Sequence, residues 1–265
     1  GADNLDVSLA MARIALADGI EQTACTPHIY PQVYPNERAD ICRRVQALAE
    51  ELRTAGVALP ITYGADIQMV PDLLQGLRGG RMATLGGGRY FLFEPPHYSV
   101  PTGFNALIRD VLASGYVPIV THPERLAWLD EAHYGWFVDA ALDGAWMQLT
   151  ADALVGRFGR RAKGWSERFL ADGLVHVLAS DGHDPHHRPP VLSAGRRVAE
   201  DWVGTREAER MVLDRPRAVL ENADPLSVPP PPGLLDDDEL AAEPPQLLRG
   251  VGGMLQRLFR GGGER

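Results

Sequence analysis

The chain has 265 residues, of which 45% are hydrophobic and 23% charged, as is usual for a globular protein. It contains no run approaching the roughly 18 apolar residues that a membrane span needs, and its net charge of -9 argues against nucleic acid as a partner. Cys25 and Cys42 do not form a paired framework, which favours a reducing, cytoplasmic compartment.

Helical and strand-like patterns alternate along most of the chain. Gly19 is expected to end the first helix, and Asn36 is expected to cap the second. In chain order the pattern predicts helix 7–18, strand 20–26, helix 36–52, strand 59–65, a short helix after Pro71, strand 89–93, helix 101–112, strand 117–121, helix 124–142, strand 146–150, helix 165–171, strand 174–179 and helical structure up to Asn222.

Repeated strand–helix units predict a parallel α/β sheet, because each crossover helix returns the chain to the same end of the sheet. Six strands are few for a closed barrel, and the sequence opens on a helix. A barrel therefore requires a further strand before Gly1, whereas an open doubly wound sheet does not. The strand pattern alone leaves both arrangements open.

The α/β region is predicted to be one domain over residues 1–223. Two segments after it differ from it in composition. Residues 224–246 are rich in proline and acidic side chains, which predicts an extended, disordered linker. Residues 247–265 place apolar side chains at helical spacing with arginines between them, which predicts an amphipathic basic tail. Such a tail can lie on an anionic membrane or dock into a protein groove.

Several predicted strands end on a side chain that can hold a metal ion. Because the carboxyl ends of neighbouring parallel strands lie side by side, ligands that are scattered in the sequence can converge on one pocket. Each candidate ligand, taken alone, could also be an ordinary residue of a turn. His186 and His187 are interpreted as residues of a solvated loop and are not candidates. The joint pattern favours a metal centre. The candidate ligands are His28, Asp66, Glu94, His122, Asp181 and His183.

The candidate chemistry is hydrolysis of a phosphate ester. Two or more metal ions bridged by carboxylates generate hydroxide near neutral pH and stabilise in-line displacement at phosphorus. Arg125 and Arg188 flank the ligand segments and can fork onto phosphate oxygens, which favours a phosphate monoester over an amide. The sequence has no cysteine-phosphatase loop, no Walker loop and no Gly-x-Ser-x-Gly elbow.

The order TPH, GADI, FLFEPP, THPER and ASDGH, followed by Arg188, resembles the polymerase-and-histidinol-phosphatase (PHP) superfamily, and specifically its bacterial tyrosine-protein phosphatases of capsular and exopolysaccharide synthesis. The resemblance covers about residues 1–222. It implies a distorted barrel of seven β/α units and a di- or trinuclear centre of manganese, or of iron, cobalt, magnesium or zinc. It also implies that the six candidate ligands bind metal and that Arg125 and Arg188 hold phosphate.

The implied substrate is the phosphorylated tyrosine-rich tail of a tyrosine kinase that controls polysaccharide export. Such an enzyme would be cytoplasmic, with residues 247–265 in contact with the inner face of the membrane or with a protein. Two other functions remain open. One is a small-molecule phosphatase, such as one acting on histidinol phosphate. The other is a catalytically weakened module that binds the kinase.

Two departures from the family pattern matter. The family begins with a strand that bears His-x-His and paired aspartates before a glycine, and this sequence starts at that glycine. Three expected ligands are thus missing, so we expect a fold without its first strand, weak metal retention and poor activity. In addition, Asp66 stands where the family usually has glutamate, which shortens the reach of that carboxylate by one methylene.

Overall fold

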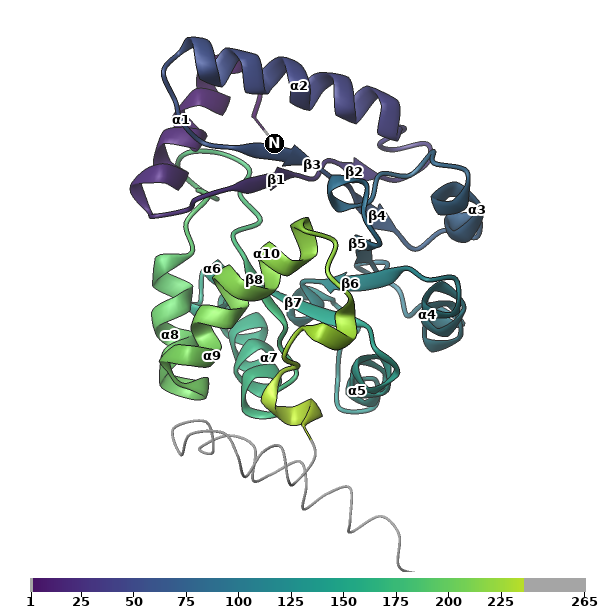
Figure 1. Ribbon diagram of the computed structural model, residues 1–265. Helices are drawn as coiled ribbons and strands as arrows, with labels where there is room; N and C mark the ends of the chain where they lie inside the picture. Colours follow the sequence, from purple (N-terminus) through teal and green to yellow (C-terminus); the bar gives the residue numbers. More distant parts are fainter. Residues whose placement is uncertain (1, 236–265) are drawn as a thin grey trace, which may run out of the picture.

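The computed structural model describes residues 2–235 and confirms a parallel α/β fold (Figure 1). All pairings between named strands are parallel. One sheet has the order β2-β4-β5-β6-β7-β8, and β1 pairs separately with β3. The strands are β1 (Thr23–Cys25), β2 (His28–Ile29), β3 (Ile61–Tyr63), β4 (Asp66–Gln68), β5 (Tyr90–Glu94), β6 (Val117–Thr121), β7 (Trp146–Thr150) and β8 (Val177–Ala179).

Helices and helical turns connect these strands, and α2 runs along the β1–β3 pair (Figure 1). The helices are α1 (Leu5–Ala17), α2 (Arg38–Thr54), α3 (Leu73–Arg78), α4 (Phe104–Ala113), α5 (Tyr134–Asp143), α6 (Ala151–Leu154), α7 (Gly159–Ala171), α8 (Ser193–Val203), α9 (Thr205–Glu209) and α10 (Arg215–Leu220). Four 3-10 turns are η1 (Leu85–Gly87), η2 (Pro123–Arg125), η4 (Pro225–Ser227) and η5 (Pro232–Leu234), and η3 (Arg210–Asp214) is a π-helical segment between α9 and α10. Among these, in the part of the chain that the structure describes, no helix is long and apolar enough to cross a bilayer.

The central strands are apolar on both sides because both faces of the sheet are covered. Phe91 and Phe93 of β5 belong to the larger hydrophobic cluster. Tyr90 of the same strand belongs to a smaller cluster that includes Val219 of α10. We call the side of Tyr90 and Val219 the α10 face of the sheet. Since side chains alternate along a strand, Glu94 lies on the α10 face as well.

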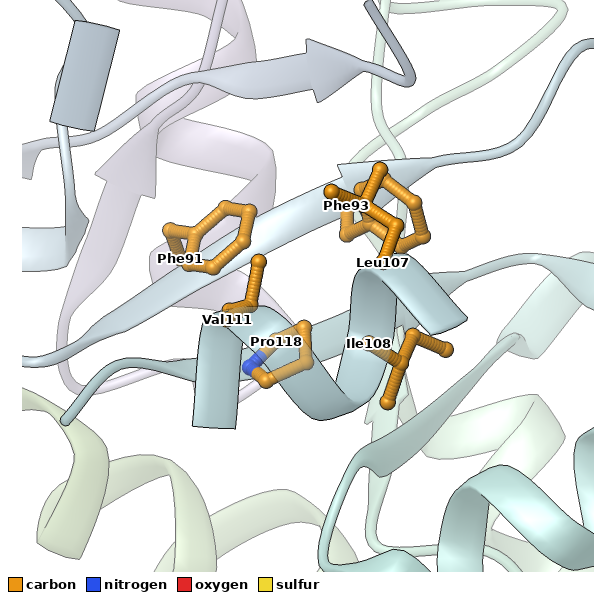
Figure 2. Close-up of a pocket in the computed structure, with 6 residues that line it drawn as sticks. All are labelled: Phe91, Phe93, Leu107, Ile108, Val111 and Pro118. Carbon is orange, nitrogen blue, oxygen red and sulfur yellow. The ribbon is translucent and has the colours of Figure 1, made fainter. Parts of the chain in front are cut away.

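The packing of α4 shows how the opposite face is closed. Figure 2 shows an apolar pocket between this helix and strands β5 and β6. No polar side chain lines it, so we assign it to the core rather than to a reactive site. The lining residues are Phe91, Phe93, Leu107, Ile108, Val111 and Pro118.

Two predictions about helices are wrong, and strands β2 and β4 were not predicted. Asn36 does not cap α2; its side-chain amide instead donates to the carbonyl oxygen of His28 at 2.8 Å. The predicted long helix over 124–142 is broken, since α5 begins only at Tyr134. The break is stabilised by Asp130, whose carboxylate accepts the backbone N–H groups of Ala132 and His133 at 3.0 Å. Such a turn satisfies backbone donors that a continuous helix would have used.

The predicted linker does not begin at residue 224, because the chain stays packed at least to Leu235. The buried guanidinium of Arg215 donates to the carbonyl oxygens of Pro229 at 3.0 Å and Pro230 at 2.9 Å. The backbone N–H of Gly233 donates to the carbonyl oxygen of Gly173 at 3.0 Å. The remainder of the predicted linker, 236–246, and the predicted tail, 247–265, lie outside the described residues.

Candidate metal centre

The first candidate ligands meet at the carboxyl edge of the sheet, on its α10 face. His28 begins β2 and is the register partner of Asp66, which begins β4. Asp66 is in turn the partner of Leu92, and Glu94 lies two residues further along the same face of β5. One ligand atom from each of His28, Asp66 and Glu94 lies within 4.8 Å of the others. The parallel register therefore brings together three residues that are far apart in the sequence.

His122 closes this group from the end of β6. Its Nε2 atom lies 3.6 Å from Asp66 Oδ2 and 3.6 Å from Glu94 Oε1. The other oxygen of Glu94, Oε2, lies 3.2 Å from Nδ1 of His28, so Glu94 presents one oxygen to each histidine. Thr121 donates its hydroxyl to Asp66 Oδ1 at 3.2 Å and orients that carboxylate.

Asp181 and His183 form a second group after β8. The side chains of Arg125 and Arg188 both donate to Asp181 Oδ2. Nδ1 of His183 lies 2.9 Å from the carbonyl oxygen of Asp181, and since a carbonyl only accepts, Nδ1 carries the proton and Nε2 remains available. The ring of Phe158 lies beneath both guanidinium groups, with Cζ of Arg125 4.3 Å and Cζ of Arg188 5.6 Å from its centroid.

Backbone strain accompanies two of the candidate ligands. His122 has φ 37° and Asp181 has φ 47°, and both residues directly or closely follow a strand of the sheet. The left-handed region costs a residue with a Cβ on the order of 1 kcal/mol or more, and it persists where surrounding structure enforces it. In addition, Nδ1 of buried His122 has no hydrogen-bond partner among the described residues. The polar contacts of His122 are therefore made through Nε2, which faces Asp66 and Glu94.

The electrostatics of the cluster favour charged carboxylates. Burial raises the pKa of Glu94, but His28, His122 and His97 outweigh it, so the pKa is lowered overall. A hydrogen bond to Glu94 raises the pKa of His28. Burial likewise raises the pKa of Asp181, but nearby cations, chiefly His122, Arg125 and Arg188, lower it overall. Ionised carboxylates opposite imidazoles are the state in which such residues bind a cation.

The donor set fits a divalent metal ion. An ion about 2.1 Å from each donor holds its donor atoms roughly 3 to 4 Å apart, which is close to the separations in this cluster. Imidazole nitrogen with carboxylate oxygen suits manganese, iron, zinc and related ions. Asp181 is paired with Arg125 and Arg188, and among the described residues no hydrogen bond or ion pair joins His183 to the cluster of His28, Asp66, Glu94 and His122.

Three residues near the site had no signal in the sequence analysis. Thr121 was visible only as the end of a strand, and Phe158 only as an aromatic residue in a loop. His97 follows Glu94 by three residues, and its ring lies 6.4 Å from that of His122. The side chains of Phe158 and His97 reach the site through loops, and strand periodicity carries no information about loop direction.

Fold and site together define an α/β protein with a candidate divalent-metal centre at the carboxyl ends of its parallel strands. The profile of the family described as capsular polysaccharide synthesis, CpsB/CapC, matches residues 1–221. The chain belongs to this family.

Named relatives agree with this assignment. The chain is 30% identical over 232 residues to the tyrosine-protein phosphatase YwqE of Bacillus subtilis, which covers 88% of this chain and 91% of YwqE. It is 25% identical to the tyrosine-protein phosphatase CpsB of Streptococcus pneumoniae, covering 83% and 92%. A chain from the crystal structures of YwqE and CpsB, described as unique metal-dependent tyrosine phosphatases, superposes with a TM-score of 0.78 at 28% identity, covering 84% of this chain and 90% of that chain.

Proposed function

We propose that the chain is a metal-dependent phosphatase that hydrolyses phosphotyrosine in a partner protein. One observation carries the proposal: a cluster of histidines and carboxylates stands beside two arginines that Phe158 and Asp181 hold in place. Metal ligands next to fixed guanidinium groups suit a phosphate monoester, which carries two negative charges. The named activity of YwqE and CpsB supports the same reaction.

The residues of the site would have two roles, metal binding and phosphate binding. His28, Asp66, Glu94 and His122 would hold the divalent cation, which supplies charge that stabilises a phosphoryl group under attack and makes water easier to deprotonate. Arg125 and Arg188 would exchange part of their pairing with Asp181 for the phosphate oxygens, which fixes the phosphorus for in-line displacement.

The arrangement of Glu94 supports a centre with more than one ion. Its two oxygens face different histidines, which suits a bridging carboxylate. Asp181 and His183 would supply ligands to a second or third position once Asp181 is released from the arginines. We propose manganese as the resident metal, with iron, cobalt, magnesium or zinc as the alternatives; magnesium fits the two imidazoles least well, because it prefers oxygen donors.

Three finer assignments belong to the same proposal. The parallel sheet corresponds to the β/α barrel of the PHP superfamily. The physiological substrate is an autophosphorylated tyrosine kinase of capsular or exopolysaccharide export, in keeping with the family's role in capsule synthesis. The reaction takes place in the cytoplasm, with residues 247–265 as the contact to the membrane face or to the export machinery.

Phosphate release and metal binding on the full chain test the proposal. We expect manganese to bind weakly and to stimulate a slow release of phosphate from a phosphotyrosine peptide, in line with the partial ligand set described above. Glu94→Gln should lower both manganese affinity and turnover by about 100-fold or more, since it removes the carboxylate that faces two histidines. Glu50→Gln, on the exposed surface of α2, is the control and should change neither.

Three outcomes would contradict the proposal. Faster turnover of histidinol phosphate than of the phosphotyrosine peptide would identify a small-molecule phosphatase. Peptide binding without any metal-stimulated phosphate release would identify a binding module. Undiminished turnover in Glu94→Gln would place the reaction elsewhere in the molecule.

A further inference from the structure

Exposed apolar side chains of the described chain gather in two loops beside the metal centre. Eight large hydrophobic side chains of this part are exposed, and five of them lie in the loops that follow β2 and β5. These are the strands that carry His28 and Glu94. The five are Tyr30, Val33, Tyr34, Tyr98 and Val100, and we call them the aromatic rim.

The loop after β2 is folded back so that two tyrosines stand on the side of the metal centre. Tyr30 and Tyr34 form an antiparallel bridge, with N···O distances of 3.0 and 2.7 Å between their backbones. Residues directly opposite one another in such a bridge project to the same side. The ring of Tyr34 stacks on His28 at 5.4 Å with an interplanar angle of 27°, and yet its residue remains 50% exposed. Tyr30 therefore projects to the side of His28 too.

The loop after β5 brings a third tyrosine near the His122 end of the same centre. The ring of His97 lies 6.4 Å from His122 and 4.8 Å from Tyr98. The backbone of this loop is fixed, because the N–H of Ala127 donates to the carbonyl oxygen of His97 at 2.9 Å. Tyr98 is 86% exposed, so its ring contributes little to the core.

We propose that the aromatic rim binds the ring of the phosphotyrosine and the apolar residues next to it in an extended, tyrosine-rich peptide. This inference rests on the proposed function and states which part of the substrate the rim recognises. With the phosphate held at Arg125, Arg188 and the metal cluster, the phenyl ring lies one ester linkage outside it. Ring contacts connect Tyr34 directly to His28, and they connect Tyr98 to His122 through His97.

The chemistry of the rim fits this occupant better than a small polar phosphate. Aromatic pairs contribute about 0.5–1.5 kcal/mol beyond the area that they bury, and tyrosine binds at low cost in conformational entropy. None of the five rim side chains is charged, so they offer no salt bridge to the ammonium group of an amino alcohol such as histidinol. A peptide with several tyrosines would cover the rim, whereas a small polar ester would leave it exposed.

The test separates recognition of the peptide from recognition of the phosphate. The Tyr30→Ser/Tyr98→Ser double variant of the full chain is assayed with a phosphotyrosine peptide that carries flanking tyrosines, with inorganic phosphate as an inhibitor and with manganese alone. We expect the KM for the peptide to rise about tenfold, equivalent to one or two lost ring contacts. The inhibition constant of phosphate and the manganese affinity should stay within about twofold.

Matched variants complete the design. The Tyr30→Phe/Tyr98→Phe double variant keeps both rings and should recover most of the peptide affinity that the serine variant loses. Leu226→Ser replaces an apolar side chain outside both loops that is even more exposed, at 96%, and should have no effect. An unchanged peptide KM in the double serine variant overturns the inference, and so does an equal loss for peptide and free phosphate. Absence of phosphate release from the peptide by the parent chain would instead overturn the proposed function.

Discussion

At the scale of single residues, Phe158 shows how a side chain without chemistry of its own can set the phosphate site. Arg125 and Arg188 converge on one carboxylate oxygen of Asp181 although both are positively charged. The ring of Phe158 lies under both guanidinium groups and attracts them electrostatically. It therefore offsets part of the repulsion between two cations that must both face the substrate.

Replacing Phe158 with leucine should weaken phosphate binding without weakening metal binding. The lost cation–π contacts are worth about 0.5–2 kcal/mol, which corresponds to a roughly twofold to thirtyfold rise in the inhibition constant of inorganic phosphate. Titration calorimetry with manganese should give the parental affinity. Phe158→Tyr retains the ring and is the control; a loss of phosphate affinity as large as that of leucine would show that packing, rather than the ring face, matters.

How far the site could be predicted depends on how each residue reaches it. His28, Asp66, Glu94 and His122 could be predicted to converge, because each is in or next to a short apolar strand and parallel strands align their ends. Phe158 and His97 could not, since they reach the site through loops. The present pairing of Asp181 with two arginines depends on a left-handed backbone that no spacing in the sequence encodes.

At the scale of secondary-structure elements, two central strands match the predictions, whereas the predicted strands 20–26 and 59–65 are each followed by a further short strand that was not predicted, β2 and β4. β6 and β7 have the predicted bounds, since a continuous apolar run buried on both faces has few alternatives. The helix predicted over 124–142 failed because apolar residues in a packed turn mimic helical spacing. There, Trp128 is buried and its indole N–H donates to the carbonyl oxygen of Pro96 at 2.7 Å.

His176 lies in the segment that leads into β8 and is buried against β7. It should make the free energy of unfolding depend on pH. The backbone N–H of Met147 donates to Nδ1 of His176 at 3.1 Å, and the imidazole stacks on Trp146 at 5.0 Å. Burial, reinforced by the positive charge of Arg215, lowers the pKa of His176 well below its ordinary value of 6.5. The folded protein therefore keeps this side chain neutral where the unfolded chain protonates it.

Stability should consequently fall as the pH drops below the unfolded-state pKa of about 6.5, because the unfolded state then binds more protons. His176 alone should remove about 1 kcal/mol of unfolding free energy between pH 7.5 and 5.5. Urea unfolding of the metal-free protein measures this, with His176→Gln expected to flatten the dependence by that amount. His187→Gln changes a side chain that is 91% exposed and should retain the parental slope. A parental slope in His176→Gln would contradict the assignment.

At the scale of the whole molecule, the described chain returns after α10 to pack against the end of α7. Arg215 lies at the centre of this contact: it pairs with Glu207 at 2.6 Å and donates to two proline carbonyls of the returning segment. Both charged side chains are almost fully buried. Because a buried guanidinium needs all of its donors satisfied, residues 229–230 are part of the folded domain rather than an appendage.

Gly233 gives a direct test of this packing in the full chain. A Cβ at this position would collide with the carbonyl oxygen of Asp172, just beyond the end of α7. Gly233→Ala should therefore force the segment away and lower the free energy of unfolding by about 1–3 kcal/mol.

The same substitution at Gly164 should have the opposite sign. Gly164 lies in the exposed interior of α7, and its Cβ would meet nothing within 4 Å. Alanine there should raise the free energy of unfolding by up to about 1 kcal/mol, since glycine costs a helix that much relative to alanine. Urea unfolding of both variants with metal removed compares them directly. If Gly233→Ala unfolds at the parental midpoint while Gly164→Ala is stabilised, the segment around Gly233 does not pack against α7 in solution.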